Sequence, residues 1–134
     1  YWDHMVYHRL DRIRNMKQSD TPALPIREIP GFEGGINFRT LTTAMPYMFS
    51  DPQERVTFLV DEGYIDYVMD WFGEDVTIEP GTRDHTLKIS LTVSPNAMHY
   101  WALQFAEAVE VLTPASLRDK IKETLTKAKE RYDI

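Results

Sequence analysis

The chain has 134 residues, of which 43% are hydrophobic, and its formal net charge is −6. This size and composition predict one compact domain with a single core, or a small domain plus a fragment. The apolar runs are too short to span a bilayer, and the lack of cysteine excludes disulfides and thiolate metal sites. The acidic balance argues against non-specific duplex binding by this chain alone, because attraction to phosphates needs a basic face. We expect a cytoplasmic protein that makes no membrane contact.

The N-terminal segment differs in charge from the rest of the chain. Residues 1–28 hold five basic and four acidic side chains, whereas the remainder holds ten basic and seventeen acidic ones. In "VYHRLDRIRN", Arg9, Arg12 and Arg14 surround Asp11. The apolar positions fit a helix directly and a strand only with a bulge. The arginines form either a surface network with Asp11 or a site for an anionic ligand, typically phosphate, because guanidinium groups are forked donors.

A linker is predicted over residues 18–53, which contain five prolines and three glycines. Within it, "LTTAMPYMF" predicts a short helical turn with apolar side chains that can pack on a neighbour. These side chains are Leu41, Met45, Tyr47, Met48 and Phe49.

An internal repeat fills the rest of the chain. When the sequence is shifted by 33 residues, positions 56–78 align with positions 89–111 without a gap. The identical pairs are Val60/Val93, Tyr67/Tyr100, Phe72/Phe105, Glu74/Glu107 and Val76/Val109.

Each copy of the repeat predicts a strand, a helix and a second strand. In the first copy, an apolar helix face ends near Gly73, which fits a C-terminal cap. In the second, "LKISLTV" alternates with the period of a strand, and Ser94 and Pro95 suit the start of a helix. A third helix is predicted from Pro114 to Tyr132, with Lys- and Glu-rich faces that we interpret as solvated.

A doubled strand–helix–strand unit of this length predicts an α+β fold, a ferredoxin-like βαββαβ sandwich with an extra C-terminal helix, over residues 54–134. The predicted core of this sandwich is Phe58, Val60, Ile65, Val68, Met69, Phe72, Leu91, Val93, Met98, Trp101, Phe105, Val109 and Val111.

Few side chains suggest chemistry. His4 and His8 have the spacing of metal ligands on a helix, but no cysteine assists them and we expect no metal site. Asp66 and Asp70 fit an exposed helix face better than acid–base catalysis. No nucleophile and base are arranged for catalysis, so we predict neither an enzyme nor a cofactor.

A second aromatic stripe lies on the first predicted helix of the repeat. Tyr64, Tyr67 and Trp71 are spaced i, i+3, i+7, on a flank different from the apolar face. Such a stripe covers either a partner, as an interface, or another part of the same chain, such as the linker or the third helix.

Two groups of motifs resemble a known family. "YHRLDRIRNM", "PALPIREIPGF" and "YMFS" resemble the end of a WYL domain and its exit in bacterial transcriptional regulators. "DWFGEDV" and "YWALQFAEAVEVLTPASLRDKI" resemble the C-terminal extension of these regulators, called WCX. The resemblance implies that residues 1–17 are the last strand of an SH3- or Sm-like barrel. The Trp-Tyr-Leu tract and most of that barrel are absent from this sequence.

The resemblance also implies a function. It implies an upstream helix-turn-helix that binds promoter DNA and a WYL barrel that senses a nucleic-acid-derived ligand, such as a nucleotide or single-stranded nucleic acid. It also implies an extension that supports a homodimer or helps to shape the ligand site. Arg9, Asp11 and Arg12 match the family's box and inherit the expected ligand contact, and Arg14 lies just beyond it. The alternative is a stand-alone ferredoxin-like module for protein association or small-molecule binding.

Overall fold

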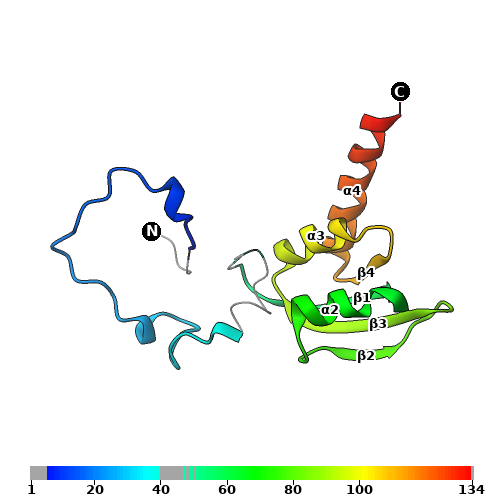
Figure 1. The fold of residues 1–134 in the computed structure, drawn as a ribbon, viewed down its shortest axis with the longest axis horizontal. Helices are drawn as coiled ribbons and strands as arrows, with labels where there is room; N and C mark the ends of the chain where they lie inside the picture. The colour runs from blue at the N-terminus through cyan, green and yellow to red at the C-terminus, as the bar shows by residue number, and fades with distance from the viewer. Residues whose placement is uncertain (1–5, 40–46, 48, 50, 134) are drawn as a thin grey trace.

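The computed structural model describes residues 6–39, 47, 49 and 51–133. Its centre is a four-stranded sheet in the order β2-β3-β1-β4, in which every neighbouring pair is antiparallel (Figure 1). The strands are β1 (Glu54–Asp61), β2 (Thr77–Pro80), β3 (Thr86–Val93) and β4 (Val109–Thr113).

Three helices pack around this sheet: α2 (Ile65–Phe72), α3 (Pro95–Gln104) and α4 (Ala115–Tyr132).

The predicted caps of α2 and α3 are confirmed. Gly73 ends α2 with a φ of 67°, a region that favours glycine. Ser94 accepts a hydrogen bond from the Ala97 amide at 3.0 Å, and Pro95 occupies the first turn of α3.

The strand order is that of a ferredoxin-like fold, and so are the two crossover helices, α2 between β1 and β2 and α3 between β3 and β4, as predicted. The 33-residue repeat corresponds to the two halves of the sandwich. Thr57 and Ser90 are equivalent in the repeat and are also paired across the central strands β1 and β3, where their hydroxyl oxygens lie 3.1 Å apart. The pseudo-twofold axis that relates the two halves therefore passes beside this pair.

The core lies between the sheet and the helices and follows the prediction closely. Trp101 is its largest fully buried side chain, with Phe58 at 5.4 Å and Phe72 at 4.9 Å between ring centroids. Of the predicted members, Ile65, Phe105 and Val109 are partly buried and pack against this core. The prediction is wrong for Met69, which is partly buried and does not belong to the core cluster. Leu117 of α4, which was not in the predicted core, is 3% exposed and closes this core.

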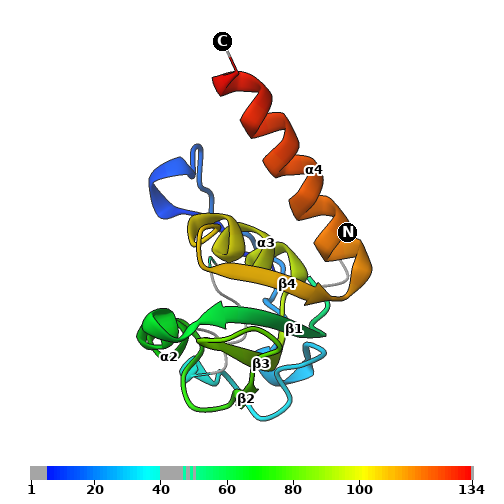
Figure 2. The ribbon, with the colours of Figure 1, turned by 90° about the vertical axis from the view of Figure 1, so that its right-hand side faces the viewer.

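The C-terminal helix α4 packs against both α3 and β4 (Figure 2). Its apolar side chains become more exposed along its length: Leu117 is buried, Leu125 is 43% exposed and Tyr132 is 85% exposed. The second half of α4 thus projects beyond the sheet (Figure 1).

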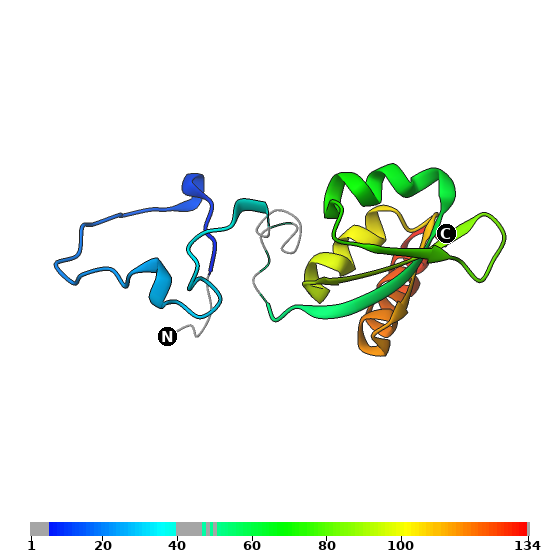
Figure 3. The ribbon, with the colours of Figure 1, turned by 90° about the horizontal axis from the view of Figure 1, so that it is seen from below.

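The N-terminal segment follows an open path beside the sheet domain (Figure 3). Our expectation of a strand in residues 1–17 is wrong for the described positions 6–17, which contain one turn of 3-10 helix at Leu10–Arg12. In this turn the Arg12 amide donates to the Arg9 carbonyl at 3.1 Å. A strand needs a hydrogen-bonded neighbour, and the described part of the chain offers none beside this segment.

Candidate functional site

The arginine segment contains one well-formed ion pair. Arg9 donates from Nε to Asp11 Oδ1 at 2.9 Å and from Nη2 to Asp11 Oδ2 at 2.5 Å, so the pair is bidentate. The side chains are 67% and 61% exposed. The turn at Leu10–Arg12 brings the two groups together, since it folds position 9 back towards position 11. Asp11 therefore fixes the plane of the Arg9 guanidinium at the surface.

Arg12 and Arg14 are both exposed, and neither forms an ion pair with another described residue. Leu10 and Met16, their apolar neighbours, are 86% and 83% exposed. The structure thus places one oriented guanidinium and two free ones along an exposed segment. This arrangement can hold an anion only weakly by itself, because exposed charges are screened by solvent.

The aromatic stripe on α2 divides into two parts. Tyr64 and Tyr67 contact each other at 5.6 Å, and both contact Phe105, at 6.3 and 5.0 Å between centroids. The Tyr64 hydroxyl donates to Glu107, and this hydrogen bond raises the pKa of Tyr64 above its ordinary value. Tyr67 is 47% exposed, so part of this surface is free to contact a partner.

The linker covers the other part of the stripe. Tyr47 lies 5.0 Å from Trp71 between ring centroids, and its hydroxyl donates to Gln104 Oε1 at 2.7 Å. Phe49 stacks on Tyr100 at 5.6 Å with an angle of 7° between the rings. Of the two alternatives for Trp71, packing of the linker is therefore what the structure shows.

Asp51 extends the same contact to the start of α3. It accepts hydrogen bonds from the Ser94 hydroxyl and from the Asn96 amide, the latter at 3.4 Å. Tyr47, Phe49 and Asp51 together form what we call the strap, which runs along α3. The sequence predicted that Tyr47 and Phe49 can pack on a neighbour, but it did not predict the role of Asp51. Asp51 lies shortly before a strand, and nothing in the local sequence indicates that its carboxylate binds the start of a helix 43 residues away. The other members of the predicted tract, Leu41, Met45 and Met48, lie outside the described residues.

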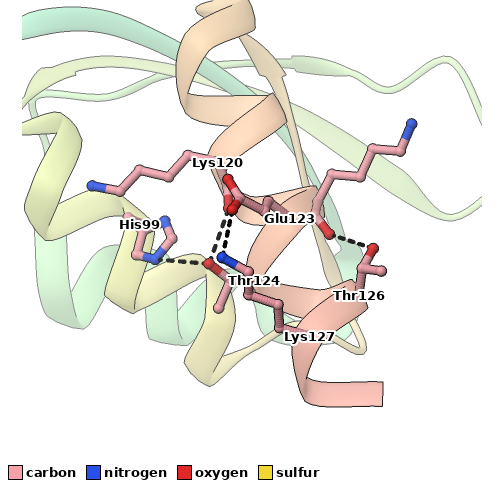
Figure 4. Close-up of polar contacts among 7 residues, drawn as sticks. His99, Lys120, Glu123, Thr124, Thr126 and Lys127 are labelled. Carbon is pink, nitrogen blue, oxygen red and sulfur yellow. Dashed lines mark hydrogen bonds and ion pairs between the residues drawn. The ribbon is translucent and has the colours of Figure 1, made fainter. Parts of the chain in front are cut away.

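A buried histidine lies between α3 and α4 (Figure 4). His99 is 6% exposed; its Nε2 lies 3.5 Å from Thr124 Oγ1, and its Nδ1 is buried without a hydrogen-bond partner in the described structure. Burial, together with the charge of Lys120, lowers the pKa of His99.

We predict that this histidine makes the domain less stable in mild acid. The depressed pKa means that the folded chain binds the proton less readily than the unfolded chain, so lowering the pH through roughly 7 to 5 favours unfolding. Urea unfolding across this range should show the decline, and His99→Gln should reduce it.

Two findings concern other classes of site. Among the described residues, no three His, Cys, Asp or Glu side chains are grouped to hold a metal ion, and His4 lies outside those residues. No helix in the described ranges combines the length and the apolar composition needed to cross a membrane.

A family model described as the WCX domain matches residues 52–129. The chain belongs to the WCX family. WCX is the C-terminal domain of WYL-containing regulators, which are regulatory proteins and not enzymes. The match covers the whole ferredoxin-like unit and most of α4, and it begins next to Asp51 of the strap. Among curated proteins, none matches the chain.

Proposed function

We propose that this chain is the C-terminal effector-sensing and dimerisation region of a WYL-type transcriptional regulator that binds promoter DNA through an N-terminal helix-turn-helix domain. The WCX match over residues 52–129 carries this proposal, because WCX domains stand at the C-terminus of such regulators. The "RLDRI" motif ahead of the matched region supports it, since this motif resembles the family's ligand box. We place the regulator in the cytoplasm, where promoter DNA is accessible.

The ligand we propose for the arginine segment is an anionic, nucleic-acid-derived effector, such as a nucleotide or a short single strand. Arg9 and Arg12 would contact its phosphates, with Arg14 adding charge, while Asp11 orients Arg9 as the bidentate pair in the structure allows. Forked guanidinium donors suit phosphate oxygens, and completion of the barrel around this segment would reduce the solvent screening that weakens it here.

For dimerisation we propose the part of the aromatic stripe that the strap leaves open. Tyr64 and Tyr67 form that part. Trp71 packs against Tyr47 of the strap, so its role in the interface would be indirect. Tyrosines of this kind are frequent in protein interfaces because they combine a large apolar ring with a polar end.

We predict that the intact regulator binds oligonucleotides through these arginines. In a titration of a short single strand and of a dinucleotide, the affinity should fall with rising salt, because each neutralised phosphate releases counterions. Arg9→Ala and Arg12→Ala should each weaken binding, and Arg9→Lys should weaken it too, since lysine keeps the charge and loses the fork. Arg27→Ala, which removes an arginine outside the motif, is the matched control.

Unchanged affinity for the oligonucleotides in both alanine variants would assign the arginines to a surface network.

The reading frame that encodes the chain gives a second, independent test. A helix-turn-helix encoded upstream supports the regulator, whereas a frame that opens at Tyr1 would support the stand-alone association or small-molecule-binding module.

A further inference from the structure

An apolar groove lies between α4 and the edge strand β4, and Ala102 near the end of α3 forms part of its floor. Its volume is about 360 Å³. Ala102 and Val111 are buried beneath it, and Leu125, which is 43% exposed, forms an apolar wall. The groove therefore keeps apolar surface accessible next to the core of the domain.

The rim of this groove is basic although the chain is acidic. Arg118, Lys122 and Lys129 line it, and Glu110 is its one carboxylate among the described residues. Glu110 is already neutralised, because Arg118 contacts it at 3.0 Å and Arg83 at 2.8 Å.

Arg118 is held firmly at one end of the groove. Besides its ion pair with Glu110, its Nη1 donates to the Val111 carbonyl on β4 at 2.5 Å. Lys122 and Lys129, in contrast, form no ion pair with any residue that the structure describes. They are two turns apart on α4 with Leu125 between them, so both ammonium groups and the apolar wall belong to one face of the helix.

We propose that this groove binds a small organic anion with an apolar body, such as an aromatic carboxylate. The apolar floor and wall would cover the body, and Lys122 and Lys129 would contact the anionic group. The volume lies at the lower end of the range of about 300–1,000 Å³ that is usual for small-molecule sites. This site is separate from the arginine segment, and it does not depend on the function proposed above.

The charges disfavour a second copy of the chain in this groove. A twofold axis through the groove would place Lys122 and Lys129 of one copy opposite the same lysines of the other. Like charges that face each other across an interface repel, whereas an incoming anion is attracted by both lysines. An inorganic anion would use the lysines alone and leave the apolar surface uncovered.

The test uses naphthoate, its neutral amide naphthamide, and inorganic phosphate as probes for the 134-residue chain. Backbone amide signals in an NMR titration should shift along α4 and β4 with naphthoate. Naphthoate should bind more tightly than naphthamide, which lacks the charge, and more tightly than phosphate, which lacks the apolar body.

Variants of the rim complete the test. The double variant Lys122→Glu/Lys129→Glu should bind naphthoate about tenfold more weakly, because both ammonium groups that would contact the carboxylate are replaced by negative charges. Lys127→Glu on the same helix is the matched control, because Lys127 lies outside this groove and pairs with Glu123 at 2.5 Å. Its affinity should equal that of the parent chain, and circular dichroism should show both variants folded.

Four results would each overturn the proposal. The first is equal affinity for naphthoate and naphthamide, and the second is an affinity that the double variant leaves unchanged. The third is an absence of shifts along α4 and β4 at millimolar probe. If sedimentation shows a dimer of the parent chain that the double variant abolishes, the groove is an interface between copies, and the proposal also fails.

Discussion

Replacement of Phe72 by alanine is expected to destabilise the domain by about 3–5 kcal/mol, the usual cost of removing a buried aromatic ring. Phe72 is 2% exposed at the end of α2, and its ring meets Trp101 edge to face at 4.9 Å. Because Trp101 also contacts Phe58, the cavity left by the substitution would open in the centre of the core. Urea unfolding followed by tryptophan fluorescence and circular dichroism measures the loss.

The repeat supplies a graded control for this experiment. Phe105 is the equivalent of Phe72 in the second half, and it is only partly buried, so Phe105→Ala should cost less. Tyr132, which is 85% exposed near the end of α4, should change the free energy of unfolding by no more than about 0.5 kcal/mol when replaced by alanine. A loss below about 1 kcal/mol for Phe72→Ala would contradict the assignment of this ring to the core.

The fold could be predicted because the same strand–helix–strand pattern occurs twice in the sequence. Equivalent places in the two halves hold Val60 and Val93, and likewise Phe72 and Phe105. The apolar pattern of one copy alone would be weak evidence for a strand or a helix, but the second copy repeats it and so supports the prediction. The caps at Gly73 and Ser94 could be predicted for a different reason: each acts within four residues of its own position.

The partners of the strap could not be predicted from the sequence. The strap joins Tyr47 to Gln104, 57 residues away, and no local period marks such a pair. The arginine segment fitted two local structures, and the structure has a third, a 3-10 turn closed by the Arg9–Asp11 pair. In a short segment of this kind, the backbone conformation depends on whether another strand or helix lies alongside, and the sequence pattern of the segment does not reveal that.

The charged faces of α4 show a further limit of sequence reasoning. We interpreted them as solvated, which fits Lys127 and its pair with Glu123. Lys122 and Lys129 carry the same charge, yet the packing of α4 against β4 places them at the rim of an apolar groove. The spacing of lysines along a helix does not reveal which of them will border a cavity, because that depends on the element packed alongside.

The second large effect is expected at Gly81, in the turn between β2 and β3. A Cβ atom at this position would lie 2.6 Å from the Thr86 carbonyl oxygen and 2.7 Å from its carbon, as well as against the Thr86 hydroxyl. Gly81→Ala should therefore cost about 1–3 kcal/mol, as for other substitutions that force backbone shifts. The Gly81 amide donates to the same Thr86 carbonyl at 2.9 Å, so relief of the clash would also lengthen this hydrogen bond.

The place of this turn in the sheet predicts where the damage should appear. β2 is an edge strand whose residues are all exposed, so the chain can relieve the clash by separating β2 from β3 while β1 and β4 stay paired. Hydrogen exchange should accelerate at the β2–β3 amides and change little between β1 and β4. Gly63→Ala is the matched control, because a Cβ there meets no atom within 4 Å, and its free energy of unfolding should stay within about 0.5 kcal/mol of the parent. If Gly81→Ala behaves like this control, the close approach of Gly81 to Thr86 does not exist in solution.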